Sequence, residues 1–115
     1  MPSYKKSEVI DFIKASGCIY LRDKGDHTIF QCGSEQISIP LHGYSNTVFE
    51  GIVQESIKKI CRHTGMSYKA LNNDISNKGM CKVIKNLEKF GINHYKVSQG
   101  GVAQRVYNDK TNNRG

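Results

Sequence analysis

The feature that most limits what this chain can fold into is a run of three short alternating segments placed between two amphipathic helical stretches. Apolar residues recur at helical spacing in residues 8–16 and 48–63. Between them, residues 19–22, 27–32 and 36–39 alternate apolar and polar side chains, which is the period of a strand. Glycine-containing turns separate these segments. The order predicts an α+β fold, α-β-β-β-α, with a three-stranded antiparallel sheet and both helices on one face.

The ends of both helices carry recognisable signals. Ser7 is placed to cap the first helix and Gly17 to end it. Gly65 is placed to end the second helix, and Pro40 ends the third strand. One side of the second helix is predicted to be apolar, through Phe49, Ile52, Val53, Ile57 and Ile60.

A second unit follows, so the chain divides into residues 1–66, residues 67–107 and a polar tail at 108–115 that is predicted to be disordered. In this unit Ser67 is expected to cap a short helix through Asn73. Ser76 is expected to cap a longer helix that reaches Phe90, with Val83, Ile84 and Leu87 facing inward and Gly91 as its end. Two strands, 92–98 and 102–107, would then form a hairpin around a Gln-Gly-Gly turn.

The order of elements in residues 48–107 is also that of a winged helix-turn-helix, with residues 76–90 as the recognition helix and the hairpin as the wing. The series Lys78, Lys82, Lys85 and Lys89 fits a face that contacts a DNA backbone. A plain solvated lysine face explains the same series, and both readings stay open.

Charge and cysteine usage bound the partners and the compartment. The 115 residues carry a formal net charge of +7, of which residues 73–115 supply +5. A basic surface of this kind attracts polyanions such as nucleic acid or an acidic partner protein. We expect no membrane partner, since no apolar run approaches the ~20 residues of a membrane span. The four cysteines are expected to be free thiols in the cytoplasm, without a metal or other cofactor.

The stretch from Gly25 through Phe30 resembles the signature of the HicA family of toxin mRNA interferases. That signature is Gly-Ser-His, two further residues and an aromatic, at the start of the second strand. The opening helix with its Gly17 stop, the segment 37–42 with Pro and His, and the segment 57–67 with Gly and Ser also agree. The resemblance covers about residues 4–70.

The resemblance implies a fold similar to the double-stranded-RNA-binding domain and a metal-independent endoribonuclease activity on messenger RNA. It implies His27 as the catalytic residue and a HicB-like antitoxin protein as the partner that masks it. His is suited to this role because it exchanges a proton near neutral pH. Further candidates for RNA contact lie beside the motif or on the second helix: Arg22, Lys24, Gly25, Asp26, His42, Lys58 and Lys59.

The chain departs from the family pattern at three places. The loop and helix start at residues 41–54 are longer than in the family, and Glu55-Ser56 stands where the family has Gly-Thr at the helix start. Asp26 stands where the family has Ser, and a carboxylate there would repel phosphate. The unit after residue 70 has no counterpart in short family members, so it is a DNA-binding wing, an arm that docks a partner, or a cover for His27. A non-catalytic RNA-binding module is the alternative for the first unit. A winged-helix DNA-binding regulator is the alternative for residues 48–107.

Overall fold

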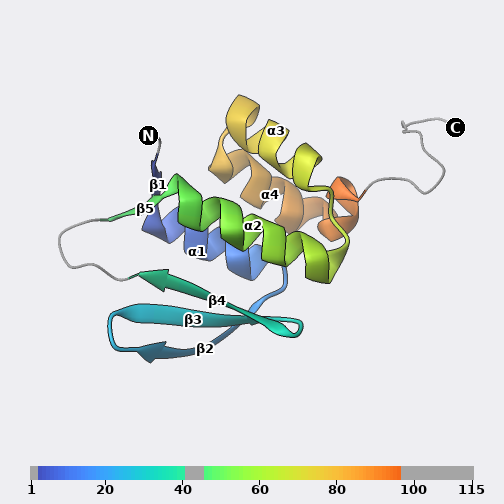
Figure 1. Ribbon diagram of the computed structural model, residues 1–115. Helices are drawn as coiled ribbons and strands as arrows, with labels where there is room; N and C mark the ends of the chain where they lie inside the picture. The colour runs from blue at the N-terminus through green and yellow to red at the C-terminus, as the bar shows by residue number, and fades with distance from the viewer. Residues whose placement is uncertain (1–2, 41–45, 97–115) are drawn as a thin grey trace, which may run out of the picture.

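The computed structural model describes residues 3–40 and 46–96 of the chain (Figure 1). The helices are α1 (Lys6–Ala15), α2 (Glu50–Thr64), α3 (Tyr68–Lys78) and α4 (Met80–Phe90), followed by the 3₁₀ turn η1 (Ile92–Tyr95). The strands are β1 (Ser3–Lys5), β2 (Ile19–Lys24), β3 (His27–Cys32), β4 (Glu35–Pro40) and β5 (Thr47–Phe49).

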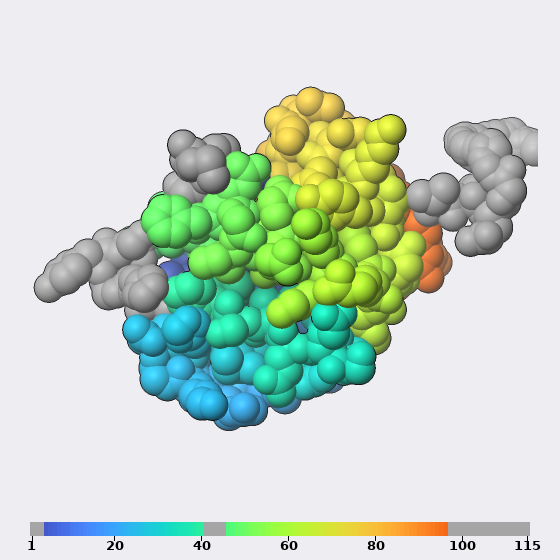
Figure 2. Space-filling model, in the orientation of Figure 1, coloured from blue at the N-terminus to red at the C-terminus, as the bar shows by residue number. Residues whose placement is uncertain are grey.

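The elements stack in three layers. The antiparallel sheet, in the order β2-β3-β4, forms the bottom layer of Figure 1, α1 and α2 lie across it, and α3 and α4 form the top layer. The space-filling view shows the same bands, with the green surface of α2 closing over the sheet and the yellow surface of α3 above it (Figure 2). The expected α+β class is confirmed.

One core runs through all three layers. Phe12, Phe30 and Ile57 are buried between the sheet and the first two helices, and they belong to one cluster with Leu71 and Val83 from the top layer. The expected boundary at residue 66 therefore does not separate two cores. Helices α3 and α4 bury their apolar faces on the same cluster that holds the first unit together.

The central strand of the sheet shows which face is buried. Phe30 and Cys32 of β3 belong to the core cluster, so their face of the sheet lies against the helices. Side chains that alternate with them, such as His27 and Ile29, lie on the opposite, outer face. Strand β2 is an edge strand whose six residues are all exposed, and its register shifts between Tyr20 and Arg22. The alternation in residues 19–22 predicts a half-buried strand, which is wrong for β2, because none of the described elements covers it.

Several helix ends fall where the sequence indicated. Gly65 ends α2 with φ 84°, and Gly91 ends α4. The Ser67 hydroxyl accepts a hydrogen bond from the backbone N–H of Ala70 at 3.1 Å, which is the expected cap of α3. The expected caps at Ser7 and Ser76 are wrong. Lys5 precedes α1 with no side-chain cap, and α3 continues past Ser76 as far as Lys78, where Gly79 separates it from α4.

A short two-stranded sheet was not predicted. Strand β1 pairs with β5 antiparallel, with Tyr4 opposite Val48. This pairing takes Phe49 out of the expected helix, so Phe49 is 70% exposed instead of joining the apolar side of α2. The rest of that side is as expected, because Val53, Ile57 and Ile60 are buried.

The cysteines differ from expectation. Cys18 and Cys32 form a disulfide that joins the chain just before β2 to the end of β3, with Cα atoms 4.8 Å apart. Free thiols are found only for Cys61 and Cys81. The sequence did not indicate this pair, because the proximity of Cys18 to Cys32 arises from the β2–β3 register, in which Ile19 lies opposite Gln31.

The predicted C-terminal hairpin is wrong in its first strand. Residues 92–95 form the 3₁₀ turn η1, whose Tyr95 carbonyl accepts a hydrogen bond from the Ser67 N–H at 2.7 Å. Met66 also forms an isolated bridge with Lys96. The end of that strand, the second strand at 102–107 and the predicted disordered tail lie outside the described residues. The winged-helix hypothesis requires a strand at this position to begin its wing, and residues 92–95 do not form one.

A buried polar contact ties η1 to the top layer, and its removal gives a testable prediction. The Tyr95 hydroxyl donates to Asp74 of α3 at 2.8 Å and accepts from Asn86 of α4 at 3.0 Å. Burial raises the pKa of Tyr95 to about 12, so the hydroxyl keeps its proton and its donor role. Tyr95→Phe should lower the free energy of unfolding by about 1–3 kcal/mol, measured by urea denaturation. Tyr20→Phe on the exposed edge strand should change it by less than about 0.5 kcal/mol, and equal effects would contradict this role.

Candidate active site at the β2–β3 turn

His27 stands at the first position of β3, directly after a two-residue turn formed by Gly25 and Asp26. Lys24 lies opposite His27 as the closing pair of the hairpin, and Gly25 has φ 59°. The left-handed conformation explains why glycine suits this position, since a side chain there is strained. On its other side His27 pairs with Pro40 at the end of β4. The imidazole is therefore carried by the central strand of the sheet, a rigid support.

The Asp26 carboxylate contacts the His27 ring. Asp26 Oδ1 lies 3.1 Å from His27 Nδ1, and the two side chains are 66% and 41% exposed. A carboxylate at this distance favours the neutral tautomer that carries its proton on Nδ1, and that tautomer has its lone pair on Nε2. The contact thus orients the ring and selects the nitrogen that can accept a proton from a bound molecule.

Two cations share the outer face of the sheet with His27. Lys24 is its direct cross-strand neighbour, and neighbours of this kind project from the same face with Cα atoms about 4.5–5.5 Å apart. Arg22 is opposite Ile29, two residues along from His27, so it also lies on this face. The structure therefore brings together Arg22, Lys24, Asp26 and His27 on the side of the sheet that faces away from the helices.

The lysines predicted on α2 belong to a different region. Lys59 Nζ donates to the backbone carbonyl of Gln36 at 2.9 Å, near the start of β4. His27 pairs with Pro40, four residues further along β4, which corresponds to about 13 Å of strand. Lys58 lies beside Glu55, at 3.9 Å, and over the ring of Tyr68. The structure does not bring these two lysines to the His27 turn.

The start of β4 is instead fixed to α2 by an ion pair. Arg62 contacts both carboxylate oxygens of Glu35, at 2.8 and 2.9 Å, in a bidentate arrangement. The hydrogen bond from Arg62 lowers the pKa of the Glu35 carboxyl below its ordinary value. Both side chains are used for this contact, so this end of the sheet has a structural role.

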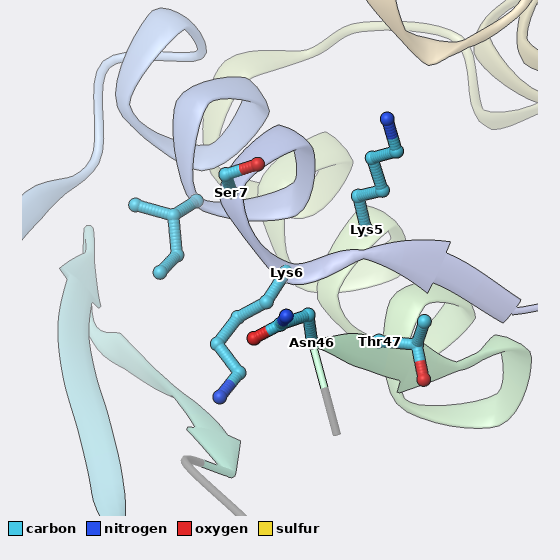
Figure 3. A pocket seen from close by; sticks show the side chains of 6 residues that line it. Lys5, Lys6, Ser7, Asn46 and Thr47 are labelled. Carbon is cyan, nitrogen blue, oxygen red and sulfur yellow. The ribbon is translucent and has the colours of Figure 1, made fainter. Parts of the chain in front are cut away.

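A second basic feature lies at the same end of the molecule as the His27 turn, and sequence reasoning missed it. A cavity of about 590 Å³ opens between the start of α1 and the start of β5. Figure 3 shows its lining, which consists of Lys5, Lys6, Ser7, Ile10, Asn46 and Thr47. Figure 1 shows the starts of α1 and β5 on the same side as the β2–β3 turn and the end of β4. The sequence feature that could have indicated this cavity is the pair of consecutive lysines, Lys5 and Lys6, before a predicted helix. His42 lies outside the described residues.

Neither a metal-ligand group nor a membrane-spanning helix is found among the described residues. In the ranges 3–40 and 46–96, no group of three or more His, Cys, Asp or Glu side chains is placed to hold a metal ion. Within the same ranges, none of the helices has the length and apolar character needed to cross a bilayer.

Comparison of the chain with protein-family models, with curated proteins and with solved structures gives no match in any of the three.

Proposed function

We propose that the chain is a metal-independent endoribonuclease that cuts messenger RNA, a toxin of the HicA kind, with His27 as its general base. The observation that carries the proposal is the Asp26–His27 contact at the β2–β3 turn, 3.1 Å between Oδ1 and Nδ1. A partly exposed imidazole on a rigid strand, oriented by a carboxylate and flanked by cations, is a combination that general base catalysis requires.

The arrangement of the first five large elements supports the same proposal. Helix α1, the antiparallel sheet β2-β3-β4 and helix α2 follow one another in the order of the double-stranded-RNA-binding domain. We propose that the chain shares that arrangement, with α3 and α4 added as a third layer behind the two helices. None of the described helices covers the outer face of the sheet, which carries His27, Lys24 and Arg22, and we propose that a long substrate binds there.

The chemistry needs no group beyond the side chains at the turn. His27 Nε2 takes the proton of a ribose 2′-hydroxyl, and the 2′-oxygen attacks the adjacent phosphorus. The bond from phosphorus to the 5′-oxygen breaks, and that oxygen receives a proton from the imidazolium or from water. The products are a 2′,3′-cyclic phosphate and a 5′-hydroxyl. Lys24 and Arg22 stabilise the negative charge that builds on the phosphate during the attack.

A substrate comparison tests this route. We expect the chain to cut a single-stranded RNA in excess chelator, with 2′,3′-cyclic phosphate ends on the upstream fragments. The same sequence made with 2′-O-methyl ribose should bind but stay intact, since it has no 2′-hydroxyl to deprotonate. Cleavage of the 2′-O-methyl strand, or activity that appears only when a metal is added, would contradict the proposed role of His27.

The Asp26 carboxylate gives a second prediction. It orients His27, but it also repels the phosphates of a substrate bound at the turn. Asp26→Ser should tighten binding of 2′-O-methyl RNA up to about fivefold at low salt, because removal of one exposed charge changes an ionic interaction by up to about 1 kcal/mol. The gain should shrink as salt is added. Fluorescence anisotropy measures it, and binding that is unchanged in the variant would show that RNA does not approach this turn.

The same basic face is suited to bind an acidic partner protein. We propose that an acidic, HicB-like antitoxin covers the outer face of the sheet and so shields His27, Lys24 and Arg22 from RNA. Opposite charge on the two proteins would speed their association and set its orientation.

A further inference from the structure

The cavity beside α1 and the lysines of α4 lie outside the His27 turn. Their positions suit the binding of a long RNA substrate, which the function proposed above requires. We propose that Lys5 and Lys6, with Lys85 of α4, form a track for single-stranded RNA that carries the strand from the His27 turn onto the C-terminal helices. The inference rests on the proposed function and names the part of the surface that holds the long substrate.

The lining of the cavity suits a nucleotide. Lys5 and Lys6 supply cations for phosphate, while Ser7, Asn46 and Thr47 supply hydroxyl and amide groups for the sugar and the base edge. Ile10 adds an apolar surface against which an unstacked base can pack. This mixture of charged, polar and apolar groups is typical of a surface that binds single strands.

The two lysines of the cavity point to different parts of the molecule. Figure 3 shows the Lys5 and Lys6 side chains extending in opposite directions from the segment that joins β1 to α1. The backbone N–H of Lys6 donates to the carbonyl of Asn46 at 2.6 Å, which fixes this segment to the chain entering β5. Asn46 follows Pro40, the partner of His27, by only six positions, so the cavity lies within about 25 Å of the turn.

The helix that follows Lys5, α1, contacts the third layer of the fold through α4. Helices α1 and α4 pack together, and Cys81 Sγ donates to a Glu8 carboxylate oxygen at 3.0 Å. That hydrogen bond raises the pKa of the Cys81 thiol, while the charges of Lys5, at the end of β1, and of Lys85, on α4, act in the opposite direction. Lys85 lies one helical turn after Cys81 on α4, and Lys5 lies three residues before Glu8, so the Glu8–Cys81 hydrogen bond brings the two lysines to the same contact between α1 and α4.

Helix α4 extends this positive surface. Lys82, Lys85 and Lys89 are exposed at spacings of three and four residues, which places them along one side of the helix. Glu88 is the one acidic residue of α4. The opposite side of α4 is buried in the core, through Val83 and Leu87 among others, so the lysine side is held at a fixed position relative to α1. In this proposal the C-terminal helices bind substrate, and they do not act as the cover for His27 that the sequence also allowed.

The test measures binding apart from cleavage. In the His27→Ala background, which should bind RNA without cutting it, Lys5, Lys6 and Lys85 are changed together to Gln. The dissociation constant for a long single-stranded RNA is then measured over a range of salt concentrations. Each lost phosphate contact on a single strand lowers the slope of log K against log salt by about 0.7, so the triple variant should lose about 2 from that slope and bind more weakly at low salt.

A matched control removes the same charge elsewhere. Lys14, Lys69 and Lys78 are exposed lysines outside the proposed track, and their triple change to Gln should alter the slope by less than one contact. Circular dichroism spectra must match for the two variants. Equal losses in test and control variants would overturn the track while leaving His27-dependent cleavage, measured separately, unaffected.

The nature of the polyanion is tested with the same proteins. Duplex DNA and vesicles containing an anionic lipid replace the RNA in the binding assay. If these lysines form an RNA track, the Lys5, Lys6 and Lys85 variant should lose more affinity for single-stranded RNA than for duplex DNA or for the vesicles. A larger loss for duplex DNA or for the vesicles would assign this surface to a different partner and overturn the proposal. Absence of RNA binding by the His27→Ala parent would overturn it as well.

Discussion

His27→Ala is expected to slow cleavage of single-stranded RNA by about 100- to 10,000-fold, the range that a general acid–base group contributes. In the proposed mechanism the imidazole takes the 2′-hydroxyl proton, and Ala leaves nothing at that position to replace it. The cations Lys24 and Arg22 remain, so binding of RNA should change little. Initial rates with a fluorescent RNA, measured in excess chelator, check the prediction.

The control for this change is another exposed histidine. His63 lies near the β3–β4 turn, beside Gly33, at the end of the sheet away from His27. His63→Ala should leave the cleavage rate within about twofold of the native value. His27 is partly exposed, so its loss should change the free energy of unfolding by less than about 0.5 kcal/mol. A rate that is unchanged in both variants would point to a contaminating nuclease, and a rate that falls equally in both would point to a general loss of structure.

The second large effect concerns stability. Leu71→Ala should lower the free energy of unfolding by about 2–5 kcal/mol, the usual cost of removing a fully buried leucine side chain. Leu71 is 0% exposed on α3, and it packs in the same cluster as Phe12, Phe30 and Ile57 of the first two layers. Because the core is shared, the whole chain should unfold in a single transition that moves to lower denaturant concentration.

Two probes make that prediction discriminating. Far-ultraviolet circular dichroism follows the helices of all layers, while fluorescence of a dye attached to Cys81 follows α4, where that thiol is exposed. Coincident transitions are expected for the native chain and for Leu71→Ala. Ile19→Ala on the exposed edge strand, where the side chain is 64% exposed, is the control and should cost less than about 0.5 kcal/mol. Two separate transitions would mean that α3 and α4 form a unit of their own.

The sequence predicted best those elements whose signals are local. The three strands of the main sheet and the helix ends at Gly65, Ser67 and Gly91 follow from alternation, helical spacing and capping residues within a few positions. The strands β1 and β5 were missed because three residues are too few to show alternation, and they exist only through their pairing. The same pairing explains the error at Phe49.

The other errors depend on contacts between distant residues. The Cys18–Cys32 disulfide requires the β2–β3 register. The 3₁₀ turn at residues 92–95 is held by Ser67 and by the Tyr95 contacts with α3 and α4, none of which is visible in a local pattern. The hairpin expected from the Gln-Gly-Gly turn does not extend to residues 92–95, because these tertiary contacts override the local preference.

The candidate site was predictable to the same extent. Residues close to His27 in sequence, namely Arg22, Lys24, Gly25 and Asp26, lie at its turn because a two-residue hairpin keeps them together. Lys58 and Lys59 could not be placed from sequence, since their distance from His27 depends on how α2 crosses the sheet. The Lys5 and Lys6 cavity depends on the β1–β5 pairing and was invisible for that reason.

The most direct experiment on the proposed endoribonuclease activity is a time course of a long single-stranded RNA incubated with the purified native chain in excess chelator. We expect the RNA to be shortened progressively, with products that end in a 2′,3′-cyclic phosphate. RNA that stays full length while the folded, partner-free protein binds it would contradict the account and identify the chain as a non-catalytic RNA-binding module.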